Sequence, residues 1–258
     1  MPRQTFKKKI TSDEQINKIN PKNVELINQF LRAKGRTCSD ATIKTYKSDL
    51  YIFFCWLVDH GNDFYIEVKK RVVSEFFNFI QDELQCHGRR FSHYRSVLSE
   101  LSSYCLKVYE DDELGNFHNF VKDIIEVPTK VAIREKTVLT KDDVNFLLKY
   151  LTDQERYQEA CLLACGVFSG MRISELEQMK VSWIDEEKLA YNDLFYRTPT
   201  MRTKGRGKEG KQIDRLIIHD LFKPYFDAWV KHRKERLKKM DVEDHDYLFI
   251  NRSGKPAS

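Results

Sequence analysis

Apolar residues recur at helical spacing through the first half of the chain and predict four helices. The apolar stripes cover residues 24–31, 43–57, 73–84 and 94–104, and a glycine follows each of the first three. Spacing of three and four residues places apolar side chains on one face of a helix, and glycine commonly ends one. Ser39 or Asp40 can cap the second helix. Four amphipathic helices of this kind predict a compact bundle.

The periodicity weakens between residues 111 and 140, where we expect a boundary between two domains. Pro128 and the polar, charged run at 130–136 are typical of an extended linker. The expected organisation is a basic flexible tail at 1–20, a helical domain at 21–127, a linker at 128–139 and a second domain at 140–258.

The second domain combines helices with short strands. Thr140 and Asp143 resemble a capping box at the start of a helix. Further helical patterns follow at 160–168, 173–178 and 222–230, and short runs of β-branched and aromatic residues predict strands at 183–184, 194–196 and 216–218. The expected fold class is therefore mainly α with a small antiparallel β-sheet.

Composition adds a mild basic excess. The 258 residues include 44 Lys and Arg against 39 Asp and Glu, a net charge of +5, which permits contact with nucleic acid without requiring it. No stretch approaches the roughly 20 apolar residues of a membrane-spanning helix, and no apolar signal region follows Phe6. We therefore expect a cytoplasmic protein with no membrane partner.

The six cysteines do not indicate a metal site. None forms a C-x-x-C motif, and no histidine lies near Cys161 and Cys165 to complete a tetrahedral set of ligands. We expect free buried thiols, no metal and no cofactor.

The sharpest local signal is the string G-M-R-I-S-E-L at 170–176. Gly170 permits a tight turn out of an apolar helix and places Arg172 at the start of the next one. A guanidinium there can hold two phosphate oxygens at once, and Glu175, one turn on, can brace it. The alternative is a surface Arg–Glu pair of a kind that many helices contain.

The pattern G-x-R-x-x-E-L after an apolar helix resembles the first arginine box of the tyrosine recombinase, or phage integrase, family. Downstream, the basic turn at 203–211, between a strand and the apolar run 216–218, resembles the family's β-hairpin with its catalytic lysine. Upstream, T-x-x-x-Y at 42–46 and the four-helix pattern resemble its core-binding domain, and 246–249 resembles the segment before its second box. The resemblance covers roughly residues 21–258.

This resemblance implies a helical, SAM-like core-binding domain followed by the N-terminal half of an α+β catalytic domain. It assigns phosphate activation to Arg172, support of that arginine to Glu175, and proton donation to the departing 5′-oxygen to Lys204, with Lys208 and Lys211 as rivals. A purely electrostatic phosphate contact is the alternative for each lysine. Contacts with double-stranded DNA are expected at Thr42, Lys44, Lys47, Arg89, Arg90, Arg95, Arg202, Arg206, Lys208 and Lys211. For the charges on the helices, a solvated face is the ordinary explanation.

In the family, a tyrosine attacks the scissile phosphate, a 3′-phosphotyrosyl link forms, and a later attack by a 5′-hydroxyl rejoins the DNA without ATP or metal. None of the twelve tyrosines matches the nucleophile, and the chain stops before the H-x-x-R box, so we expect DNA binding without cleavage. Full-length members act as homotetramers on DNA. For this chain, a monomer is the alternative. The alternatives are a catalytically silent protein that occupies or regulates recombination sites, and an unrelated helical regulator.

Overall fold

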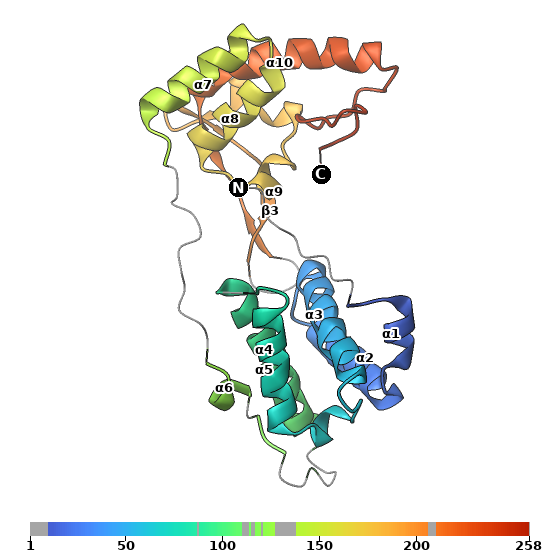
Figure 1. Ribbon diagram of the computed structural model, residues 1–258. Coiled ribbons are helices and arrows are strands. Elements are labelled where there is room, and N and C mark those ends of the chain that lie inside the picture. The colour runs from blue at the N-terminus through green and yellow to red at the C-terminus, as the bar shows by residue number, and fades with distance from the viewer. Residues whose placement is uncertain are drawn as a thin grey trace. The chain divides into compact units, whose positions relative to one another are not determined.

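The structure is a computed structural model in which two compact units are distinguished (Figure 1). They comprise Met1–Glu135 and Lys136–Ser258, and each has its own hydrophobic core. The division falls within the expected linker at 128–139. The described residues are 10–86, 88–109, 114, 117–119, 121–126, 138–205 and 210–257.

The first unit is helical, and the four predicted helices correspond to α2, α3, α4 and α5. Its core is rich in aromatic side chains, among which Phe30, Phe53 and Phe76 are fully buried. The elements of this unit are α1 (Asp13–Lys18), α2 (Pro21–Lys34), α3 (Asp40–Val58), η1 (Tyr65–Glu67), α4 (Lys70–Asp82), α5 (Arg89–Val108) and α6 (Val121–Ile124).

Polar side chains fix where α2 and α3 begin. The side chain of Asn20 accepts a hydrogen bond from the backbone N–H of Lys22 at 3.0 Å, and Pro21 occupies the first turn, where no backbone donor is needed. Of the two candidate caps for α3, Ser39 is the one that acts: its Oγ accepts from the backbone N–H of Thr42 at 3.4 Å.

The structure differs from the expected tail at residues 1–20, because α1 lies within it. Ser12 caps α1 by accepting from the backbone N–H of Gln15 at 3.2 Å, and Ile19 is 3% exposed in the core. The helix has six residues and no buried residue of its own, so it leaves no apolar periodicity in the sequence. Residues 1–9 lie outside the described part of the chain.

The second unit packs three longer helices against two small sheets. Helix α8 contacts both α7 and α10, and Figure 1 shows α10, in orange to red, running beside them. The elements are α7 (Lys141–Asp153), α8 (Tyr157–Ser169), α9 (Ile173–Leu176), η2 (Val181–Trp183), η3 (Glu186–Lys188), β1 (Leu189–Ala190), β2 (Phe195–Arg197), β3 (Met201–Thr203), β4 (Lys211–Ile213), β5 (Leu216–Ile218) and α10 (His219–Lys239).

The strands form antiparallel sheets, so the predicted fold class is confirmed. One sheet has the order β1-β2-β5, with Tyr196 opposite Ile217, and the other is the hairpin β3-β4, with Thr203 opposite Lys211. The capping box predicted at the start of α7 is present. The strand predicted at 183–184 is wrong, because Trp183 ends the 3₁₀ helix η2.

Contacts with a distant segment explain this error. The backbone N–H of Val181 donates to the carbonyl oxygen of Asp246 at 2.8 Å, and that of Ser182 donates to the Asp246 side chain at 3.0 Å. These bonds hold the chain in a turn despite the strand propensity of Trp183 and Ile184. Over the part of the chain that the structure describes, no helix is long and apolar enough to span a bilayer.

Candidate functional site

The turn between α8 and α9 places Arg172 at the start of a helix, as the sequence predicts. Gly170 ends α8 with φ +65°, a left-handed conformation that glycine adopts without steric cost. Its backbone N–H donates to the carbonyl oxygen of Gly166 at 3.0 Å. The next residue, Met171, is 8% exposed and anchors the turn in the core. Arg172 follows as the N-cap of α9, and 59% of its side chain is exposed.

A fully buried carboxylate, Glu175, holds this arginine. Its Oε1 accepts hydrogen bonds from Arg172 Nη1 at 3.2 Å and from the hydroxyl of Thr203. Its Oε2 accepts from the backbone N–H of Arg172 at 3.1 Å. The same oxygen accepts from Arg215, at 3.1 Å from Nε and 2.8 Å from Nη2. A buried charge is costly unless it is paired and hydrogen-bonded, and Glu175 meets both conditions.

These contacts keep Glu175 ionised. Burial on its own raises the pKa of the carboxyl group, because a charge is less stable away from water. The hydrogen bonds from Thr203, from Arg215 and from the backbone of Arg172 outweigh burial and lower the pKa to about 2. At neutral pH the negative charge therefore stays in place between two guanidinium groups.

The hairpin β3-β4 is fastened to α9 beside this carboxylate. The Gln178 side chain pairs twice with the backbone of Arg202: its Oε1 accepts from the N–H at 3.1 Å, and its Nε2 donates to the carbonyl oxygen at 2.8 Å. Thr203, which is 5% exposed, donates to Glu175 and accepts from Arg172 Nη1 at 3.4 Å. Helix α9 and strand β3 are in contact, and Figure 1 shows them next to each other.

Lys204 directly follows Thr203, the last residue of β3, at the start of the turn to β4, and it is exposed. Because Thr203 is hydrogen-bonded to both Arg172 and Glu175, the predicted lysine follows a residue fixed on the predicted arginine. The closing side of the turn is tight: Gly210 has φ +68°, and a Cβ there would lie 2.4 Å from the carbonyl oxygen of Thr203. The structure thus brings together Arg172, Glu175 and the start of the basic turn.

The structure describes only some of the other residues predicted to bind DNA in and beside this turn. Lys211 is exposed on β4 opposite Thr203, and Arg202 is exposed on β3 opposite Gln212. Arg206 and Lys208 lie outside the described residues. Lys211 is therefore the rival of Lys204 that the structure places at the anchored end of the hairpin.

In the first unit, the predicted DNA-binding residues of α3 are on its outer face. Lys44 and Lys47 are exposed, and Lys47 Nζ lies 5.7 Å from the centre of the Tyr51 ring. The Thr42 hydroxyl is 3.0 Å from Ser39 Oγ and so belongs to the helix cap. The two lysines have the exposure that a phosphate contact requires.

The predicted arginines of α5 have different surroundings. Arg89 is exposed and Arg95 is half-buried. Arg90 pairs with the buried carboxylate of Asp49, donates to the hydroxyl of Tyr94 at 3.0 Å and lies over that ring at 4.4 Å. Its contacts join α3 to α5, which is a structural role that the sequence did not indicate.

Sequence reasoning missed Thr203, Gln178 and Arg215 as parts of the site. Arg215 lies 40 residues from Glu175 along the chain, so no helical spacing connects them. The available signal was weak: an arginine immediately before the predicted buried strand at 216–218.

Comparison with known proteins finds relatives along most of the chain, although no family model matches it. The chain is 27% identical over 234 residues to the SPβ prophage-derived recombinase-like protein YomM of Bacillus subtilis, covering 89% of this chain and 65% of YomM. It is 22% identical over 228 residues to the tyrosine recombinase XerD of Oceanobacillus iheyensis, covering 88% of this chain and 69% of XerD. The chain thus spans about two thirds of the length of these relatives.

Solved structures of two integrases share the fold. The Tn1549 transposon integrase in complex with transposon right end DNA superposes with a TM-score of 0.58 at 16% identity, over 92% of this chain and 73% of that one. A lambda integrase dimer bound to a COC′ core site gives a TM-score of 0.56 at 16% identity, over 96% and 63%. The sequence likeness and the shared fold agree: the chain is similar in sequence to tyrosine recombinases and has the fold of these two integrases.

Proposed function

We propose that this chain works on double-stranded DNA in site-specific recombination or integration, with Arg172 as the group that binds the reacting phosphate. The observation that carries the proposal is the way the guanidinium is held. Its Nη1 donates to Glu175 and Thr203, whereas Nε and Nη2 have no hydrogen-bond partner among the described residues. Those two nitrogens form the edge of the group that can grip two phosphate oxygens in parallel.

The chemistry follows from where charge develops. When a hydroxyl attacks a phosphodiester, negative charge grows on the equatorial oxygens of the pentacoordinate transition state, and a rigid arginine stabilises it. The buried, ionised Glu175 keeps Arg172 from turning away, so little reorganisation is needed during the reaction.

The departing 5′-oxygen needs a proton, for which we propose Lys204. Thr203 ties the hairpin to Arg172 immediately before this lysine, which supports the choice. Lys211 is exposed on the facing strand and stays a rival, as does Lys208. Exposed cations of the first unit, among them Lys44 and Lys47, supply further phosphate contacts in this proposal.

The covalent step of the family needs a tyrosine nucleophile, and three tyrosines of the second unit make other contacts. Tyr150 stacks on Phe146, and Tyr157 stacks on His232. The hydroxyl of Tyr196 donates to Glu186. We therefore propose that this chain binds DNA and holds the phosphate, and that incubation with a nicked site yields no protein–DNA adduct.

A phosphate scan tests the assigned arginine in the chain as it exists. Sites are selected from a random duplex library, and each phosphate of a selected site is replaced in turn by a neutral methylphosphonate. We expect one phosphate whose neutralisation weakens binding by about tenfold for the wild type and by less than about twofold for Arg172→Ala, because a charge-assisted pair is already lost in the variant.

The Arg202→Ala variant is the control, because it removes a cation from the same hairpin and leaves the partners of Glu175 in place. It should weaken binding evenly and keep the discrimination at the special phosphate. If no phosphate of any selected site depends on Arg172 in this way, the proposed role is wrong. Undetectable affinity for duplex DNA at low salt would contradict the whole proposal.

A further inference from the structure

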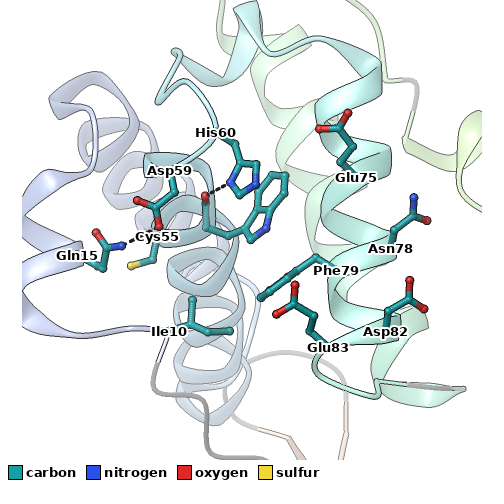
Figure 2. Close-up of a pocket in the computed structure, with 11 residues that line it drawn as sticks. Ile10, Gln15, Cys55, Asp59, His60, Glu75, Asn78, Phe79, Asp82 and Glu83 are labelled. Carbon is teal, nitrogen blue, oxygen red and sulfur yellow. Dashed lines mark hydrogen bonds between the residues drawn. The ribbon is translucent and has the colours of Figure 1, made fainter.

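A groove of about 650 Å³ lies in the first unit, away from the residues assigned above. It is bounded by the start of the described chain and α1, by the end of α3, and by one face of α4 (Figure 2). Figure 2 shows Glu75, Asn78 and Asp82 along one side, and Gln15 and Asp59 across from them. A concavity of this size accepts several side chains of a peptide.

Aromatic rings supply the apolar surface of the groove. Trp56 is 6% exposed, and its ring stacks on that of His60 with 3.7 Å between centroids. Phe79 packs against Trp56 at 6.0 Å and is half-buried on α4. Such surfaces favour aromatic side chains and the methylene groups of lysine.

The rim of the groove is acidic. Asp59, Glu75, Asp82 and Glu83 line it, all exposed, and no lysine or arginine is among the lining residues. Glu75 has an exposed neighbour in Arg71 at 3.5 Å, a pair that water screens strongly. In a chain of net charge +5, this concentration of carboxylates repels DNA phosphates and attracts cations.

A polar side chain of the groove wall, Gln15, is held in a fixed position. Gln15 Nε2 donates to Asp59 at 3.0 Å, which fixes the orientation of the amide group. The opposite atom of that amide, Oε1, is buried and has no hydrogen-bond partner among the described residues.

We infer that this groove binds the basic segment at residues 3–9 of this chain, which lie outside the described residues. The segment carries four cations, Arg3 and Lys7 to Lys9, with Phe6 among them. Its charge complements the four carboxylates of the rim, and Phe6 matches the aromatic floor.

Connectivity supports the same occupant. Ile10 follows the segment directly and is itself a lining residue of the groove. Four extended residues reach about 13 Å, so Phe6 is within range of the floor. The cations that dock there are withdrawn from DNA, and the groove and duplex DNA therefore compete for one segment.

A labelled peptide with the sequence of residues 2–9 tests this inference by fluorescence anisotropy at about 20 mM salt, where screening is weak. The recipient is the full chain in which Phe6 and Lys7 to Lys9 are changed to alanine, so that its own segment does not compete. Adding Glu75→Gln and Asp82→Asn should weaken peptide binding by about fivefold, because two ion pairs are lost. The wild-type chain should bind the peptide several-fold more weakly than the recipient.

The matched control adds Glu25→Gln and Glu67→Gln, two exposed carboxylates of the same unit that do not line the groove. It should change peptide binding by less than about twofold, since the net charge changes equally but no pair is lost. A peptide with Phe6→Ala should bind more weakly than the native peptide.

Equal loss in the groove and control variants overturns the inference, as does peptide binding that ignores Glu75 and Asp82. If the wild-type and recipient chains bind the peptide equally well, sedimentation tests whether the segment docks into a second copy of the chain. Self-association of the wild type that disappears in Glu75→Gln/Asp82→Asn supports docking into a second copy, and its absence overturns the inference.

Discussion

Each unit contains a buried carboxylate that binds an arginine, and the two pairs differ in what they join. Asp49, which is 1% exposed, binds Arg90 and lies 2.6 Å from Nδ1 of His93, so its contacts connect α3 with α5. Glu175 connects α9, β3 and the residue before β5 through Arg172, Thr203 and Arg215.

The difference lies in how each guanidinium is placed. Arg90 lies over the ring of Tyr94 and donates to its hydroxyl, so the group is used for packing within the helical unit. Arg172 is held through Nη1 and keeps its other edge toward solvent beside a basic hairpin. An arginine bound to a buried acid therefore indicates a ligand site only when an unused edge faces a place that a ligand can reach.

The largest expected effect is that of Glu175→Gln. It removes the charge between Arg172 and Arg215 and should lower the free energy of unfolding of the second unit by about 3 kcal/mol, because Arg215, whose side chain is 22% exposed, loses its buried carboxylate partner. Urea unfolding followed by tryptophan fluorescence in a Trp56→Phe background reports this unit through Trp183 and Trp229. A change below about 1 kcal/mol would contradict the structural account of Glu175.

Arg215→Ala should have the next largest effect, about 2 kcal/mol at neutral pH, because Glu175 keeps Arg172 and Thr203 as partners. It should also change the response to acid. The folded pKa of Glu175, about 2, is below its unfolded value, so its contribution is complete above the unfolded pKa and is lost as pH falls toward 2.

Loss of Arg215 removes part of what lowers this pKa, and the variant should therefore lose less stability than the wild type as pH falls from about 5 to 2. Glu186 titrates in the same range, with a pKa of about 2, but its partners are Lys223, Tyr196 and His219, so its contribution cancels in the comparison. Parallel pH profiles for the two proteins would show that Arg215 does not stabilise the charge of Glu175.

Asp49→Asn should have a smaller effect, about 1.5 kcal/mol, confined to the first unit. Arg90 is 42% exposed and His93 is 37% exposed, so water can replace much of what the carboxylate supplies. The fluorescence of Trp56 during unfolding reports this unit. Dependence of DNA binding on the phosphate that Arg172 is proposed to bind should persist in this variant, and its loss would show that the two clusters are not separate in function.

The smallest effect is expected for Lys47→Ala on α3. Removing the phosphate contact proposed for Lys47 should reduce the slope of log affinity against log salt by about 0.9 and should weaken all duplex sequences alike. Titration of DNA at several salt concentrations measures the slope. Asp40→Asn on the same helix serves as a control that removes no cation, and it should leave the slope unchanged.

How much the sequence predicts follows from how local each interaction is. The four helices of the first unit depend on spacing and on caps such as Ser39, which operate within a few residues. Arg172 and Glu175 are three residues apart in one helix turn, and they too were predicted. Thr203 and Arg215 reach Glu175 only through the tertiary fold, and nothing in their local sequence specifies that contact.

The errors have the same origin. Trp183 and Ile184 have the composition of a strand, but bonds from their neighbours to Asp246 impose a turn. Helix α1 is short, and it is held from outside by Asn62, whose side chain donates to the carbonyl oxygen of Lys18 at 2.8 Å. In both cases a residue distant in the chain decides a local conformation.

The side-chain amide of Gln178 also affects whether the β3-β4 hairpin can pair with another chain. Arg202 turns its peptide N–H and C=O away from β4, and on that side one glutamine side chain occupies the position of a neighbouring strand. A two-stranded ribbon is barely stable by itself, and an open edge invites pairing with other chains. The Gln178 side chain thus makes the two hydrogen bonds to Arg202 that a third strand would make, and it hinders pairing of this edge with another chain.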